Sequence, residues 1–139
     1  MKTFLDTNVI LDIYFPDRQG KENALTIIQI GNLHLTSRTY ISSLTIANAH
    51  YILRKSQGKE KALSCIKELV ETCKISGIGD QVVYDAAHSS SPDFEDALQI
   101  AAAEGSACDV IVTHNKMHFA DYTALPVYTP EEFLAKCRK

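Results

Sequence analysis

The sequence lacks the features that mark several classes of protein. No apolar run approaches the roughly 18–20 residues that a membrane-spanning helix needs, so no membrane partner is expected. An acid, Asp6, stands where a signal peptide would need its apolar stretch. The chain has no low-complexity segment, no long Pro/Gly/Ser linker and no internal repeat. These absences predict a cytoplasmic protein with a single domain over residues 1–139.

Basic charge is also scarce, because 14 Lys and Arg residues face 17 Asp and Glu residues, for a net charge of −3. A protein that binds nucleic acid through its overall charge would be basic. Any RNA partner must therefore be held by a local patch or through metal ions. The four cysteines include no C-x-x-C pair, and we expect free, mostly buried thiols rather than disulfides or zinc ligands.

What the chain does have is an alternation of strand-like and helix-like segments. Hydrophobic residues make up 45% of it and charged residues 22%, as in an ordinary globular domain. Strands are expected near residues 3–5, 39–41, 74–78, 109–113 and 126–128. Helices are expected near residues 9–15, 22–30, 44–55, 59–72, 80–87, 93–104 and from 129 onward. This order predicts an α/β fold, a three-layer α/β/α sandwich with a central parallel sheet.

The helix expected over residues 59–72 shows the clearest apolar stripe. Its spacing predicts that Leu63, Ile66 and Val70 lie on one face, together with Ala62 and Leu69. We expect this face to be buried against the rest of the domain.

Polar residues at the ends of two predicted strands indicate a site. Asp6 ends the first strand, and residues 113–115 follow the clearest later one. Functional sites of parallel sheets gather at the carboxyl ends of the strands. Asp93 and Asp96 are three residues apart at the start of a helix, so their side chains can share one side of its first turn.

Carboxylates that meet in one cleft need a cation. At ~4 Å and an effective dielectric constant of ~20, each pair of like charges costs about 4 kcal/mol. Oxygen ligands select Mg²⁺ or Mn²⁺, which suits attack of water on a phosphodiester. Each residue also has a simpler explanation: Asp93 and the segment 6–8 are good helix caps, and Asn115 is an ordinary turn residue. The expected convergence of three separate segments favours the metal site.

Four segments resemble the PIN-domain family of small metal-dependent ribonucleases, which includes toxins of bacterial toxin–antitoxin pairs. The segments that match are residues 4–12, 93–98, 111–116 with Phe119, and 129–134. The resemblance covers nearly the whole chain in the expected order. It implies an α/β/α fold, divalent-metal-dependent cleavage of RNA, a homodimer in most cases and an antitoxin-like inhibitor protein.

The same resemblance implies roles for particular residues. Asp6 matches the first acid of the family and Asp96 the third, and Asp93 stands where an auxiliary acid is often found. Asn48 and Asn115 stand where the second and fourth acids are expected. An amide oxygen can bind a metal ion but brings no charge. We therefore expect a weaker metal site, or one with a single ion, in a pocket that the two asparagines complete.

The predicted substrate contacts lie around this pocket. A basic rim for the phosphate backbone is expected from Arg18, His114 and Lys116. Asn8 and Thr113 are assigned to the substrate site because they belong to the same two segments as the expected acids.

Other functions find less support in the sequence. The pair His114 and His118 has a zinc-like spacing but no Glu base between its members, and Cys65 and Cys73 fall on a core-type helix. No glycine-rich phosphate loop is present. The alternative that stays open is a catalytically weakened PIN-like module that binds RNA or a protein partner without cleavage. Its acidic crevice would then accept an Arg or Lys from an antitoxin-like peptide.

Overall fold

The protein is built around a five-stranded parallel sheet with the strand order β3-β2-β1-β4-β5. The computed structural model describes residues 1–33 and 37–138. The strands are β1 (Lys2–Leu5), β2 (Arg38–Ser42), β3 (Lys74–Ser76), β4 (Val110–Val112) and β5 (Val127–Tyr128). The predicted parallel sheet is confirmed, and β1 pairs directly with β4, so the two polar segments at their carboxyl ends are neighbours.

Helices precede or follow each strand, as the sequence predicts. They are α1 (Thr7–Tyr14), α2 (Lys21–Gly31), α3 (Ser43–Gln57), α4 (Lys59–Thr72), α5 (Asp80–Ala87), α6 (Phe94–Gly105), α7 (Lys116–Phe119) and α8 (Pro130–Cys137). Most bounds agree with the prediction to within two residues. Helix α7 and the short 3₁₀ helix Ala120–Tyr122 were not predicted.

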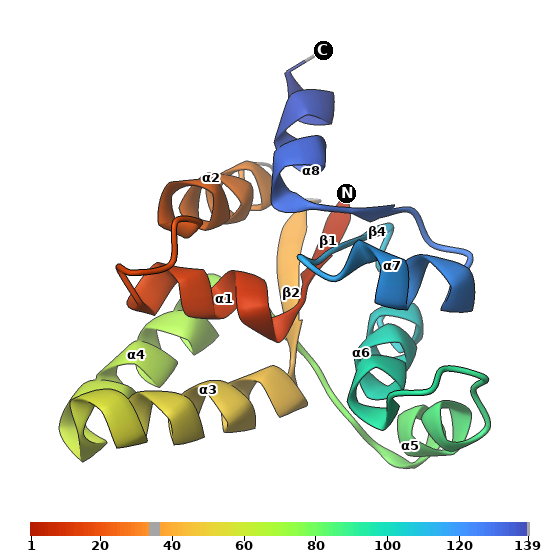
Figure 1. Cartoon of the computed structure of the whole chain (residues 1–139), viewed down its shortest axis with the longest axis horizontal. Helices are drawn as coiled ribbons and strands as arrows, with labels where there is room; N and C mark the ends of the chain where they lie inside the picture. Colours follow the sequence, from red (N-terminus) through yellow and green to blue (C-terminus); the bar gives the residue numbers. More distant parts are fainter. Residues whose placement is uncertain (34–36, 139) are drawn as a thin grey trace.

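The alternation of side chains along the strands creates two hydrophobic layers. Leu5 and Val112 face one side of the sheet, where they pack with residues of α1, α2, α4 and α8. Phe4 and Ile111 face the other side, where they pack with residues of α6 and α7. Figure 1 shows the sheet between α1, α2 and α4 on its left and α5 to α7 on its right. This arrangement confirms the three-layer α/β/α sandwich.

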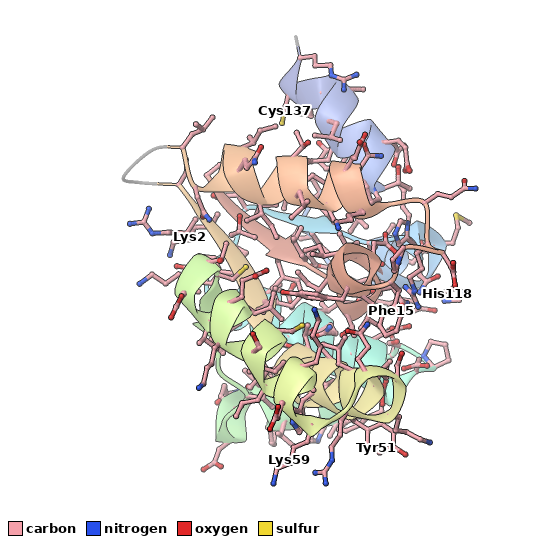
Figure 2. The ribbon with its side chains drawn as sticks, turned by 90° about the vertical axis from the view of Figure 1, so that its left-hand side faces the viewer. Lys2, Phe15, Tyr51, Lys59, His118 and Cys137 are labelled. Atoms are coloured by element: carbon pink, nitrogen blue, oxygen red, sulfur yellow. The ribbon has the colours of Figure 1, made fainter. Side chains whose placement is uncertain are left out.

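Helices α3 and α4 form a hairpin at one end of the molecule. Gly58 joins them with a φ of 89°, a left-handed value that favours glycine. Figure 2 shows the hairpin with its labelled residues Tyr51 and Lys59, at the opposite end from Cys137 of α8. The apolar stripe predicted for α4 is partly wrong, because Leu63 and Val70 are 47% and 49% exposed. The buried residues of α4 are Ala62, Cys65 and Leu69, a narrower stripe that packs against α1, α3 and the sheet.

The structure also describes the lengths of the helices and the state of the cysteines. None of the helices among residues 1–33 and 37–138 is long and apolar enough to cross a membrane. All four cysteines are free, and Cys65, Cys73 and Cys108 are buried while Cys137 is exposed. The prediction of free, mostly buried thiols is confirmed.

The close contact between α2 and β2 generates a stability prediction. A Cβ atom added at Gly31 would lie 2.1 Å from the hydroxyl oxygen of Thr39, a fully buried residue of β2. Helical Gly→Ala changes usually stabilise by roughly 0.5–1 kcal/mol. We expect Gly31→Ala instead to lower the free energy of unfolding by about 1–3 kcal/mol, because the methyl group overpacks the core. Chemical denaturation measures the change.

Gly105 provides the matched control, since it also ends a helix. Its added Cβ would make an ordinary 3.4 Å contact with Val82. Gly105→Ala should therefore be neutral or stabilising. Equal effects of the two substitutions would contradict the proposed packing constraint.

Candidate active site

The candidate site lies at the carboxyl end of β1, where Asp6 leaves the sheet. The Asp6 N–H donates to the Val112 carbonyl at 3.0 Å, which extends the β1–β4 pairing to the last residue before α1. The Asp6 side chain caps α1 by accepting from the Thr7 N–H at 2.8 Å. The Asp6 side chain is also buried, because the residue is only 5% exposed. The sequence favours this geometry because Asp is a good N-cap residue directly after a buried strand.

Two further donors hold the Asp6 carboxylate. The Gln99 amide nitrogen donates to Oδ1 at 3.1 Å, and the Thr113 hydroxyl donates to Oδ2 at 2.8 Å. Thr113 is fully buried after β4, and its hydroxyl also accepts from the Asn115 N–H at 3.0 Å. This differs from the predicted substrate contact, because a fully buried hydroxyl that is bonded to Asp6 has no exposed face for a substrate.

A pocket of about 300 Å³ opens beside Asp6. Helices α1, α3 and α6 and the turn after β4 contribute to its walls. Its acidic and amide side chains are Asp6, Asn8, Asn48, Glu95, Asp96, Gln99 and Asn115. Within the described ranges 1–33 and 37–138, no Lys, Arg or His side chain lines it. The pocket therefore concentrates negative charge without a protein cation to balance it.

The half-buried Asp96 responds to this charge. Burial, followed by the negative charges of Asp93 and Asp6, raises its pKa to about 6. The charge of His118 acts in the opposite direction. The negative charge of Asp6 thus disfavours the ionised form of Asp96, and both residues line the same pocket.

Asp93 occupies a different position from the other two predicted acids. Its Oδ1 accepts from the Asp96 N–H at 3.0 Å, which makes it the N-cap of α6. Its side chain lines a neighbouring cavity of about 330 Å³ with Met117, His118 and Tyr122, and Asp96 lines both cavities. The structure thus brings Asp6 and Asp96 into one pocket and leaves Asp93 beside it. The predicted metal contact of Asp93 stays a prediction.

Comparison with known proteins identifies the family. The family model of the PIN domain matches residues 2–117. Ribonuclease VapC1 of Aquifex aeolicus (strain VF5) is 32% identical over 140 residues, which cover 95% of this chain and 92% of the relative. The chain belongs to the PIN-domain family.

Solved structures have the same fold. VapBC-1 from nontypeable Haemophilus influenzae superimposes with a TM-score of 0.73 at 21% identity, covering 94% of this chain and 99% of that one. A toxin–antitoxin complex from Klebsiella pneumoniae gives a TM-score of 0.67 at 19% identity, covering 92% and 97%. PIN-domain ribonucleases generally depend on a divalent metal ion.

The donor set of the PIN pocket fits a hard divalent cation. Among the described residues, every charged group that lines it is a carboxylate, and the remaining polar side chains are amides and the hydroxyls of Thr7 and Tyr51. Within the described part of the chain, no three His, Cys, Asp or Glu side chains form a ready-made metal cage. Mg²⁺ does not need one, because it binds through one or two carboxylates and completes its shell with water and phosphate oxygens. Asp6 and Asp96 meet that requirement.

The two asparagines that the sequence analysis predicts at acid positions also line this pocket. Asn48 comes from α3, and Asn115 comes from the turn between β4 and α7. Asn8, on the first turn of α1, lines it as well. Glu95 was missed by the sequence analysis, although it stands directly before Asp96 in the first turn of α6.

The predicted basic rim is bound to carboxylates outside the pocket. His114 Nε2 lies 2.6 Å from Asp12 Oδ2, and Arg18 Nη1 lies 3.4 Å from Asp12 Oδ1. Lys116 pairs with Glu132 of α8 at 3.0 Å. Asp12 is only 4% exposed and was not singled out from the sequence, although an acid within an apolar helix is a signal for a buried partner. These three side chains are therefore paired outside the pocket, and their contact with substrate stays a prediction.

The raised pKa of Asp96 predicts a pH effect on the metal-free protein. We expect its carboxyl carbon to titrate near pH 6 by ¹³C NMR, and Asp6→Asn to lower that midpoint by removing a negative charge. The unfolded chain releases this proton near pH 3.8, so the folded state holds an extra proton between about pH 4 and 6. The free energy of unfolding should fall as pH rises through this window.

Asp96→Asn removes the titrating group and is the control. This variant should lose the fall in stability between pH 4 and 6. A midpoint near 4 in the wild-type protein, unchanged by Asp6→Asn, would mean that the two carboxylates do not interact.

Proposed function

We propose that this protein is a divalent-metal-dependent endoribonuclease that hydrolyses RNA phosphodiester bonds, and that it is the toxin of a toxin–antitoxin pair. The observation that carries the proposal is the uncompensated negative charge of Asp6 and Asp96 in one pocket. Burial of like charges without a counter-ion is unfavourable, so the pocket favours a cation as its ligand. The phosphate oxygens of RNA would complete the surroundings of such a cation.

The residues of the pocket have distinct roles in this reaction. A bound Mg²⁺ or Mn²⁺ supplies positive charge at the scissile phosphate and lowers the pKa of water. Asp6 and Asp96 hold the ion. Asn48 and Asn115 offer amide N–H donors to the ribose-phosphate and amide oxygens to the ion or to water. The pocket offers no Lys, His or Cys within the described residues, so the attacking group is water rather than a side chain.

The relatives support the choice of substrate. The Aquifex aeolicus relative is named a ribonuclease, and it is alike over 95% of this chain. The PIN-domain family model matches residues 2–117, a range that includes Asp6 and Asp96. We expect the protein to act in the cytoplasm, where its RNA substrates are found.

Protein partners are proposed on two grounds. The superimposed Klebsiella pneumoniae structure is a toxin–antitoxin complex, which supports an antitoxin-like inhibitor for this chain. Exposed apolar side chains on α4 (Leu63, Val70) and on α5 (Val83, Tyr84) offer surface for an inhibitor and for a second copy of the chain in a homodimer. Light scattering of the purified protein measures the homodimer directly.

The central prediction concerns RNA cleavage. Protein free of contaminating nuclease should cleave RNA with Mg²⁺ or Mn²⁺ and stop when EDTA removes the ion. Asp6→Asn and Asp96→Asn should each lower the rate by about a hundredfold or more, since each removes one of two charges that hold the ion. Gel assays with end-labelled RNA measure the rates.

A matched control guards against contamination. Glu60→Gln removes an exposed carboxylate from the first turn of α4, outside the pocket, and should leave the rate unchanged. If the wild type, Asp6→Asn and Asp96→Asn share one residual activity, the nuclease proposal fails. The non-cleaving binding module then becomes the better description.

The asparagine at the second acid position generates a separate prediction. Asn48→Glu adds a negative charge to the wall of the pocket and should tighten Mn²⁺ binding by about tenfold, equivalent to ~1.4 kcal/mol. Asn48→Gln extends the side chain equally without adding charge and should not tighten binding. Isothermal titration calorimetry compares the two. Equal affinities would show that Asn48 does not face the ion.

A further inference from the structure

We propose that Gln99 is a positioning residue that fixes the Asp6 carboxylate and leaves Oδ2 as the oxygen that Asp6 offers to a cation. The test by Mn²⁺ binding rests on the proposed function, whereas the test by crystal structures of the metal-free protein does not. Gln99 lies on α6 and is 3% exposed. Its side chain lines the pocket, where it meets Asp6 and residues of α1, β2 and α3.

The amide of Gln99 is fully used in hydrogen bonds. Its nitrogen lies 3.1 Å from Asp6 Oδ1, 3.1 Å from the Thr7 hydroxyl and 2.9 Å from the Thr45 hydroxyl. Its oxygen accepts from the Ser42 hydroxyl. An amide nitrogen has two hydrogens, so Asp6, Thr7 and Thr45 share them.

The chemistry of the neighbours decides which end of the amide faces Asp6. The Ser42 oxygen accepts from the Thr45 N–H at 3.0 Å as the N-cap of α3, which leaves its proton for the Gln99 oxygen. A carboxylate can only accept hydrogen bonds when it is ionised. Reversing the amide would place its oxygen against Asp6, so the N–H donor must face the carboxylate.

Counting donors on Asp6 identifies its free acceptor position. Among the residues that the structure describes, Oδ1 accepts from the Thr7 N–H and from Gln99, whereas Oδ2 accepts from the Thr113 hydroxyl alone. Each carboxylate oxygen has about two lone-pair positions. Oδ1 is therefore saturated, and Oδ2 keeps one position for a ligand. Without Gln99, Oδ1 gains a free position and the carboxylate loses one of three constraints on its rotation.

Helix α6 links the two acids of the pocket through this bond. Gln99 follows Asp96 by three residues, so both side chains project from the same side of the helix. Asp96 lines the pocket directly, and Gln99 donates to Asp6, the acid that follows β1. A single rigid element thus sets the position of one carboxylate and the orientation of the other.

The test measures Mn²⁺ binding, without RNA, in variants that remove the amide. Gln99→Leu keeps the approximate volume of the side chain. It removes the hydrogen bonds that the Gln99 amide makes with Asp6, Thr7, Ser42 and Thr45. We expect its Kd for Mn²⁺ to rise about tenfold or more, the range found when residues that orient metal ligands are lost. Gln99→Met, which preserves the unbranched shape, provides the same test if the leucine variant does not fold.

Thr45→Val is the matched control. It removes a buried partner of Gln99 but no bond to Asp6, so its Kd should stay within about threefold of the wild type. A general loosening of the site would affect both variants equally. Equal losses in Gln99→Leu and Thr45→Val would therefore overturn the specific role of Gln99.

Crystal structures of the metal-free wild type and Gln99→Leu provide the readout that needs neither metal nor RNA. We expect the Asp6 carboxylate of the variant to rotate away from its bond with Thr113. An unmoved carboxylate together with an unchanged Kd would overturn the proposal. Absence of RNA cleavage by the wild type would count against the proposed function and would leave both of these measurements able to decide the role of Gln99.

Discussion

The burial of one negatively charged side chain, Asp6, is the constraint on which the rest of the site depends. A carboxylate that is 5% exposed needs hydrogen-bond donors, and the protein supplies three from different parts of the chain. The Thr7 N–H comes from the start of α1, Gln99 from α6 and Thr113 from the end of β4. Satisfying this one group therefore brings together the ends of two neighbouring strands and two helices. The pocket forms where those elements meet.

The second acid differs from the first because no side-chain or backbone donor among the described residues bonds to its carboxylate. Burial, followed by the negative charges of Asp93 and Asp6, raises the pKa of Asp96 to about 6. Asp93, which contributes to that shift, uses its own carboxylate to cap the same helix. One acid is thus held rigid by hydrogen bonds, and the other is held in place by its helix and destabilised by its neighbours.

Much of the fold follows from local sequence signals. The run at residues 2–5 followed by Asp6, the N-caps Ser42 and Asp93, and the capping box at Thr129 each place an element within a residue or two. Helix α7 was missed because four residues are too few to show a helical period. Asp6 and Asp96 could be predicted from the sequence, because Asp6 follows a predicted strand and Asp96 lies in the first turn of a predicted helix. Gln99 and Asp12 were not, since their partners are distant in sequence and only the folded chain brings them together.

The positions of the four cysteine thiols have a practical consequence. Burial raises the pKa of the Cys73 and Cys108 thiols to about 12 and also raises that of Cys65. Cys137 is the one exposed thiol, near the end of α8 and at the opposite end of the molecule from the α3–α4 hairpin (Figure 2). A maleimide dye would therefore label the native protein at a single position without altering the sequence. Such a fluorophore would report the approach of a large ligand to the molecule while leaving the acidic pocket untouched.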